Sequence, residues 1–167
     1  MLPPLNSIKV FLRAILFLCA IGVAHADQPK LFLHSSLDEL EMTYAGEPFL
    51  LSVWSIECGP CFKELEVLGK LREEYPAFNL ILLSADSADV MEEVEGFLTE
   101  FNLSEENSWV YGSNRSEQLR YVIDPAWYGE MPRSYFYDKD GKRTSVSGLL
   151  SEGVLRRWIA STIDSSS

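Results

Sequence analysis

The sequence is organised around the stretch Phe49–Leu71, which reads FLLSVWSIECGPCFKELEVLGKL. Its first six residues, Phe49–Trp54, are apolar apart from one serine and predict a buried strand. A tight turn then holds the motif Cys-Gly-Pro-Cys at residues 58–61, and an amphipathic helix is expected to run on from Pro60. Proline suits the first turn of a helix because its missing N–H would have no partner there. The stretch therefore predicts a strand, a turn and a helix, with two cysteines where the helix begins.

The spacing of the two cysteines fits thiol–disulfide exchange. The thiolate is the reactive form of cysteine, and the positive end of a helix dipole favours it at the helix N-terminus. Two intervening residues let Cys58 stay exposed while Cys61, one turn further in, can attack a mixed disulfide formed on Cys58. The motif therefore indicates a dithiol/disulfide exchange centre.

The first 26 residues differ in kind from the rest and predict a cleaved secretory signal peptide. Lys9 and Arg13 supply a positive region, Ala14–Val23 an apolar region, and Ala24-His25-Ala26 an Ala-x-Ala cleavage site. An apolar region this short is a poor membrane span. We therefore expect export to the periplasm and a division of the chain into two parts, a signal peptide over residues 1–26 and a single domain over residues 27–167.

Length and charge limit the class of protein. A chain of 167 residues that is 47% hydrophobic can form one domain with a sizeable core. The formal net charge is −11, and removing the leader with its two positive charges leaves 12 Lys+Arg against 25 Asp+Glu, or −13. Such a charge keeps a protein soluble and repels phosphate backbones, so we expect no nucleic-acid partner.

The cysteine count narrows the role of the motif. Once Cys19 leaves with the signal peptide, the chain retains only Cys58 and Cys61. This excludes a scaffold held together by several disulfides. A structural zinc site would need two further ligands, and only His34 remains upstream. We therefore expect no metal and no organic cofactor beyond a redox-active Cys58–Cys61 disulfide.

The pattern of the remaining chain predicts an α/β fold with a mixed sheet. A βαβ unit requires a right-handed crossover and a parallel strand pair, whereas a hairpin is antiparallel. The sheet should therefore be mixed and covered by helices on both faces. On the helix after the motif, the leucines are expected to face the core and Glu64 to face outward with the other charged residues. The other predicted elements are an edge strand over Leu31–His34, a helix over Leu37–Tyr44, a strand over Asn79–Ser84, a helix capped by Asp86 or Ser87, a strand over Ser108–Tyr111, a helix from Ser113 or Asn114, a hairpin of Ser134–Tyr137 with Arg143–Ser147, and a helix from Ser151 or Glu152.

These features together resemble the thioredoxin fold and, within it, the exported TlpA/ResA-like thiol–disulfide oxidoreductases. The resemblance rests on the signal peptide, Trp54 four residues before Cys58, the Cys-Gly-Pro-Cys motif, and a helical insertion ahead of Met131-Pro132 and its hairpin. It covers essentially the whole chain after the leader. It implies a thioredoxin fold with an N-terminal extension and a helical insertion before the cis-proline hairpin.

The resemblance also implies roles for individual residues. Met131-Pro132 matches the family's cis-proline, which lies beside the two sulfurs and aligns a substrate peptide, against the weaker alternative of an ordinary trans-proline at a strand entry. Glu64 matches a glutamate that tunes the cysteine pair, against the alternative of a solvated helix face. The aromatic pair Trp127 and Tyr128 could belong to the docking surface or to the core. The implied catalytic residues are Cys58, Cys61, Pro132 and Glu64, and the implied substrate-binding residues are Trp54, Glu57, Gly59, Pro60 and Met131.

Three positions depart from the family pattern. Ser52 lies where relatives carry a buried aspartate or asparagine, so proton transfer from Cys61 must use water or Glu64. Glu57 replaces a tryptophan, and its negative charge opposes a thiolate on Cys58, which makes the pair more reducing. Glu66 replaces a proline that kinks the helix in relatives. These departures leave the exchange chemistry intact and bear on the identity of the client.

The sequence favours a reductase of protein disulfides. The resemblance implies partners as well: a membrane electron donor of the thiol-transporter type, and clients such as apocytochrome c or copper-site proteins of respiratory oxidases. We expect a monomer. Three alternatives stay open, namely a disulfide oxidase or isomerase on the same fold, an assembly protein that binds Cu(I) through Cys58 and Cys61, and a non-catalytic binding module.

Overall fold

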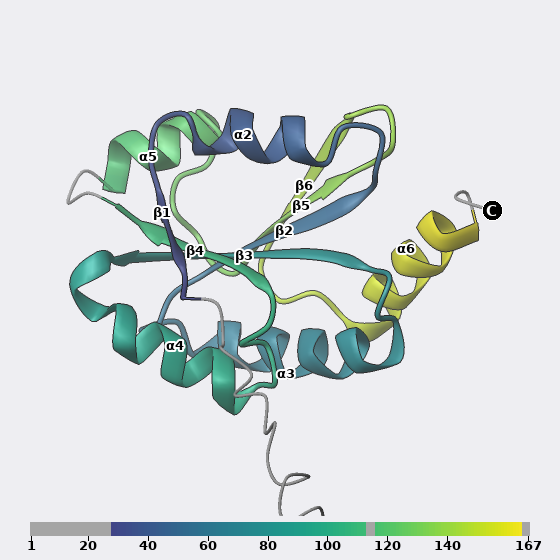
Figure 1. Ribbon diagram of the computed structural model, residues 1–167, viewed down its shortest axis with the longest axis horizontal. Coiled ribbons are helices and arrows are strands. Elements are labelled where there is room, and N and C mark those ends of the chain that lie inside the picture. Colours follow the sequence, from purple (N-terminus) through teal and green to yellow (C-terminus); the bar gives the residue numbers. More distant parts are fainter. Residues whose placement is uncertain (1–27, 113–115, 165–167) are drawn as a thin grey trace, which may run out of the picture.

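Strand β2 (Phe49–Trp54) is buried along its whole length and lies inside a six-stranded sheet with the order β1-β4-β3-β2-β5-β6. The computed structural model describes residues 28–112 and 116–164 (Figure 1). The predicted signal peptide lies outside the described residues, as do Ser113 and Asn114. Within the described ranges, no helix has both the length and the apolar character needed to cross a membrane.

The sheet is mixed, as the sequence predicts. Strands β1 (Lys30–Phe32), β4 (Asn107–Tyr111), β3 (Asn79–Ser87) and β2 pair in parallel, and β5 (Arg133–Tyr137) and β6 (Arg143–Ser147) continue the sheet antiparallel. Strand β3 extends three residues beyond the predicted end at Ser84. The chain between β3 and the β5–β6 hairpin contributes a strand as well as helices, and this strand, β4, lies between β1 and β3 in the sheet.

Helices cover both faces of the sheet, as Figure 1 shows. Helices α3 (Gly59–Glu74), α4 (Met91–Glu100) and α6 (Glu152–Asp164) lie on one face, and α2 (Ser36–Thr43) and α5 (Ser116–Ile123) on the other. Successive residues of a strand point to opposite faces, so Leu50 and Trp54 pack toward α3, whereas Leu51 and Val53 pack toward α2 and α5.

The predicted start of the helix after β3 needs a correction. A short 3₁₀ turn, η1 (Ala88–Val90), precedes α4, and the residue at its N-terminal boundary is Ser87. Asp86 does not cap this segment. Its carboxylate turns instead toward the loop that follows β2, where it accepts hydrogen bonds from Ser55 and Ile56.

Candidate active site: a cysteine pair where helix α3 begins

The two cysteines form a disulfide in the first turn of α3, with an S–S distance of 2.01 Å. Cys58 occupies the N-cap position, and the backbone N–H of Cys61 donates to the carbonyl oxygen of Cys58 over 2.9 Å. Cys61 is 0% exposed, whereas Cys58 is partly exposed. The arrangement therefore presents one sulfur to the solvent and keeps the other inside, which is what the exchange chemistry requires.

The turn before Cys58 is held by Asp86 from the end of β3. Its carboxylate accepts hydrogen bonds from Ser55 Oγ at 2.8 Å, the Ile56 backbone N–H at 2.9 Å and Ser84 Oγ at 2.6 Å. Ser55 Oγ in turn accepts from the backbone N–H of Glu57 at 3.2 Å. This network fixes the backbone that leads into the cysteine motif, and nothing in the local sequence pattern predicted it.

Glu64 lies inside the molecule, so the prediction that it faces outward is wrong. Its side chain is 1% exposed. Oε1 accepts from Ser52 Oγ at 3.2 Å and from Ser134 Oγ at 3.0 Å, and Oε2 accepts from the backbone N–H of Leu150 at 3.0 Å. The signal was present in the sequence, because Cys61, Glu64 and Leu65 follow the spacing of a buried helical stripe.

Burial raises the pKa of Glu64 above its ordinary value of 4.5. The hydrogen bonds from Leu150, Ser134 and Ser52 pull the pKa of this carboxyl down but do not cancel the effect of burial, since none of these donors carries a charge. Glu64 is therefore a buried acid one helical turn from Cys61, suited to taking up and releasing a proton.

The segment before β5 carries the expected proline. The Met131–Pro132 peptide bond is cis, which decides between the two conformations left open by the sequence. Val53 pairs with Arg133 across β2 and β5, so Pro132 lies at the end of the sheet where β2 runs into the cysteine motif. Met131 packs against the same apolar cluster as the two cysteines.

The remaining predicted contact residues divide between core and surface. Trp54 is 1% exposed and packs edge-on against Phe97, so its side chain lies in the core. Glu57 is exposed, and so are Gly59 and Pro60 of the motif. Of the aromatic pair, Trp127 is buried in the core, whereas Tyr128 is 90% exposed on the surface.

No metal-binding cluster accompanies the cysteines among residues 28–112 and 116–164. A cluster here means three or more His, Cys, Asp or Glu side chains that could hold one ion, and the described residues contain none. The reactive groups that the described residues bring to the site are the two sulfurs, the buried Glu64 carboxyl and the exposed carboxylate of Glu57.

No family model matches the chain, and no curated protein matches its sequence. Several solved structures are similar to it. A secreted Mycobacterium tuberculosis disulfide oxidoreductase, homologous to Escherichia coli DsbE, aligns with a TM-score of 0.59 and 20% identity over 72% of this chain and 85% of that one. A thiol:disulfide interchange protein of the thioredoxin family from Chlorobium tepidum gives 0.58 and 13% over 73% and 83%.

StoA from Bacillus subtilis is also similar, with a TM-score of 0.52 and 18% identity over 70% of this chain and 85% of that one. At this level of identity the similarity concerns the fold. The predicted fold class is thus confirmed by the sheet, by the helices on its two faces and by these neighbours. The chain has the thioredoxin fold, with a disulfide-forming pair, Cys58 and Cys61, where helix α3 begins.

Proposed function

We propose that the protein is an exported thiol–disulfide oxidoreductase that reduces disulfides in other proteins through Cys58 and Cys61. The observation that carries the proposal is the disulfide in the first turn of α3, with one sulfur partly exposed and the other buried. The names of the similar structures support it, since they include a disulfide oxidoreductase and a thiol:disulfide interchange protein.

The reaction proceeds through a mixed disulfide. The thiolate of Cys58 attacks one sulfur of the client disulfide, whose S–S bond breaks and releases a first client thiolate. Cys61 then loses its proton and attacks the sulfur of Cys58, which releases the second client thiolate. The client gains two electrons and, once both thiolates are protonated, two protons, and the protein is left with the Cys58–Cys61 disulfide.

Glu64 is the proposed acceptor of the proton from Cys61. It lies three residues further along α3, on the buried side of the helix. Burial raises its pKa toward that of a thiol, so a proton passes between the two groups more readily than to an ordinary carboxylate. Ser52 cannot act as a base, and it supports this role by donating to Glu64.

The residues around Cys58 support the proposed reductive direction. Glu57 is exposed beside it, and its negative charge disfavours the thiolate and so favours the disulfide after exchange. A reductase in the periplasm must be recharged, and we assign this step to a membrane thiol transporter. The proposed clients are apocytochrome c or copper-site proteins. The form that binds them is a monomeric domain of residues 27–167, after removal of the signal peptide.

The reduction potential of the Cys58/Cys61 pair tests the direction. Equilibration with dithiothreitol should give a value near that of thioredoxin, about −270 mV. A value near about −120 mV would instead make the protein a disulfide donor. As a test of the chemistry itself, Cys58→Ser should abolish insulin reduction, while Cys61→Ser should accumulate a mixed disulfide with insulin that can be isolated on a non-reducing gel. If Cys58→Ser keeps its activity, the proposal is wrong.

A further inference from the structure

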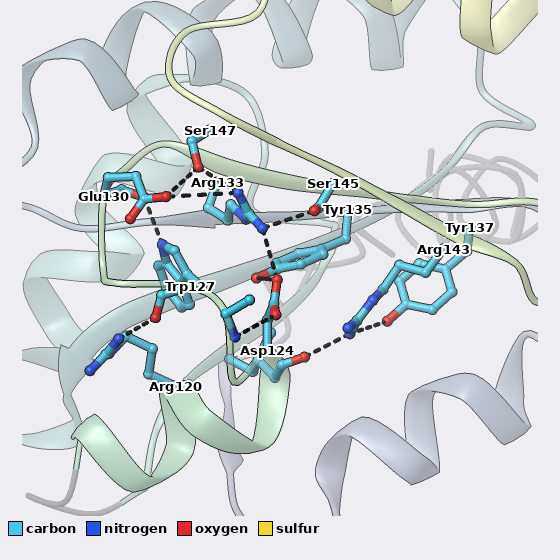
Figure 2. Close-up of polar contacts among 12 residues, drawn as sticks. Arg120, Asp124, Trp127, Glu130, Arg133, Tyr135, Tyr137, Arg143, Ser145 and Ser147 are labelled. Carbon is cyan, nitrogen blue, oxygen red and sulfur yellow. Dashed lines mark hydrogen bonds and ion pairs between the residues drawn. The ribbon is translucent and has the colours of Figure 1, made fainter.

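The loop that carries Met131 and Pro132 is closed at its base by an ion pair, drawn in Figure 2. Asp124 directly follows α5 and Arg133 opens β5, so the two residues mark the ends of the loop formed by residues 124–133. Arg133 Nη2 lies 2.8 Å from Asp124 Oδ2, and both side chains are 12% exposed. The pair therefore joins the two ends of the loop in a nearly buried position.

Further contacts hold each member of the pair. Arg133 donates to Ser145 Oγ at 2.8 Å and to Ser147 Oγ at 2.5 Å on the neighbouring strand β6. Its guanidinium lies 5.1 Å from the ring centre of Tyr135, whose hydroxyl donates to Asp124 Oδ2 over 3.4 Å. The guanidinium thus ties the base of the loop to the β5–β6 hairpin.

The loop itself is braced above this base. Trp127 Nε1 donates to the carbonyl oxygen of Glu130 at 2.8 Å, and Glu130 Oε1 accepts from Ser147 Oγ at 2.7 Å. The carbonyl oxygen of Pro132 accepts from the backbone N–H of Gly148 at 2.8 Å. These contacts connect the middle of the loop to the strand that Arg133 also holds, as Figure 2 shows for Trp127, Glu130 and Ser147.

On the side that faces α5, Arg120 donates a hydrogen bond to the carbonyl oxygen of Trp127, and a cleft lies beside this contact (Figure 2). Pro125, Trp127 and Tyr128 line a cleft of about 480 Å³ that they share with Tyr121 of α5. Tyr128 projects from the loop with 90% of its surface exposed. The position of the loop therefore depends on the Arg120 contact, on the contacts at its base and on those along β6.

The Asp124 carboxyl is charged at neutral pH. Burial acts to raise the pKa of Asp124, but the hydrogen bonds from Ala126 and Arg133, with the charges of Arg133 and Arg143, outweigh it and hold that pKa below its ordinary value. The carboxylate therefore stays ionised and paired at neutral pH.

We propose that Asp124 and Arg133 are positioning residues that hold Met131 and Pro132 in place for an extended segment of a protein client, and so set a preference for polypeptide disulfides over small ones. The inference rests on the proposed oxidoreductase function. A small disulfide needs access only to Cys58, whereas a polypeptide must also align along the loop. An error of about 1 Å in such alignment can cost up to about a hundredfold in rate.

Arg133→Lys is the variant that tests this proposal. It keeps the positive charge but loses the planar group that reaches Asp124, Ser145 and Ser147 together. Arg143→Lys is the matched control. Arg143 lies 5.0 Å from the same Tyr135 ring and bonds to the Ile123 carbonyl oxygen at 2.7 Å, but it contacts no residue of the loop between the ion-paired ends.

The measurement is the second-order rate constant for oxidation of the pre-reduced full-length protein, with insulin as the polypeptide disulfide and dithiobis(nitrobenzoate) as the small one. Arg133→Lys should slow the reaction with insulin about tenfold and slow the reaction with dithiobis(nitrobenzoate) far less. The ratio of the insulin rate constant to the dithiobis(nitrobenzoate) rate constant should therefore fall. Arg143→Lys should leave that ratio unchanged. The reduction potential of the Cys58/Cys61 pair should be the same in all three proteins.

Ser145→Ala combined with Ser147→Ala gives a second test that leaves both charges in place. This double variant should lower the ratio of the insulin to the dithiobis(nitrobenzoate) rate constant, but by less than Arg133→Lys does. An equal loss with both disulfides, or an equal ratio in Arg133→Lys and Arg143→Lys, overturns the positioning role. Failure of the wild-type protein to react with either disulfide would instead overturn the proposed function, so the two failures are distinguishable.

Discussion

Two buried carboxyl groups lie on opposite faces of the sheet, and both bond to the same short stretch of β5. Glu64 accepts from Ser134 on the face covered by α3, whereas Asp124 accepts from Arg133 and Tyr135 on the face covered by α5. The alternation of side chains along a strand produces this division. The two groups therefore share one strand but meet different partners.

The groups that surround each carboxyl determine the direction of its pKa shift. Glu64 receives hydrogen bonds from neutral donors alone, so burial dominates and its pKa rises. Asp124 accepts from the backbone N–H of Ala126 and faces the guanidinium of Arg133, and together these partners lower its pKa despite burial. Burial by itself thus does not make a carboxyl neutral. One group is suited to exchange a proton near the sulfurs, and the other is suited to remain a fixed charge at the base of a loop.

The largest effect should come from breaking the charged pair. Asp124→Ala leaves the nearly buried Arg133 guanidinium with only the half-exposed Glu130 carboxylate, 3.8 Å away, as a counter-charge, and we expect a loss of about 3 kcal/mol in the free energy of unfolding. Asp124→Ala combined with Arg133→Met should recover part of that loss, because no unpaired charge remains. Urea denaturation measures both values, and equal losses in the single and double variants would contradict the account.

The pH dependence of stability should differ in sign between the two carboxyls. The native pKa of Glu64 lies above 4.5, so the native state binds more protons than the unfolded state, and Glu64 lowers stability as pH rises from about 4.5 through the native value. The native pKa of Asp124 lies below 3.8, so its contribution is present above that pH and is lost as pH falls through the native value.

Variants separate these two contributions. Glu64→Gln should remove the loss of stability above pH 4.5, and Asp124→Asn should remove the loss in acid below pH 3.8. The measurement is the free energy of unfolding of each variant relative to wild type across pH. If the difference in the free energy of unfolding between Glu64→Gln and wild type does not vary with pH, Glu64 has the same pKa in the native and unfolded states.

The smallest effect should come from Ser134→Ala. It removes one of the hydrogen bonds to Glu64 and leaves those from Ser52 and Leu150. We expect a loss of about 1 kcal/mol in stability and a further rise in the pKa of Glu64, since the lost bond favoured the carboxylate. NMR titration of the Glu64 carboxyl carbon measures the pKa, and an unchanged value would show that Ser134 is only a spacer.

Local patterns in the sequence were enough to predict most of the helices and strands and the mixed sheet. The apolar run Phe49–Trp54, the Cys-Gly-Pro-Cys motif and the leucine stripe predicted β2, the turn and α3, since each signal lies within a few residues of the next. The mixed sheet and the β5–β6 hairpin followed from strand order and from the turn at residues 138–142. The burial of Glu64 could also have been derived from its spacing to Cys61 and Leu68.

The polar supports of the site could not be predicted in this way. Asp86 and Ile56 are 30 residues apart, and their contact depends on how the end of β3 lies against the turn after β2. No local sequence pattern distinguishes Asp124, because the pairing of its carboxylate with Arg133 requires the folded loop between them. Contacts of this kind depend on tertiary structure, and the residues involved have no distinctive local pattern.

The three hydrogen bonds to Glu64 have a consequence for the order of folding. Their sequence separations are 12, 70 and 86 residues, so the carboxyl collects its partners from β2, from β5 and from the residue that precedes α6 by two positions. Contacts between residues far apart in the chain carry a large loop-closure entropy and form late. We therefore expect Glu64 to gain all three hydrogen-bond partners only after β5 and the segment before α6 have docked, so that this buried acid near the cysteine pair is completed late in folding.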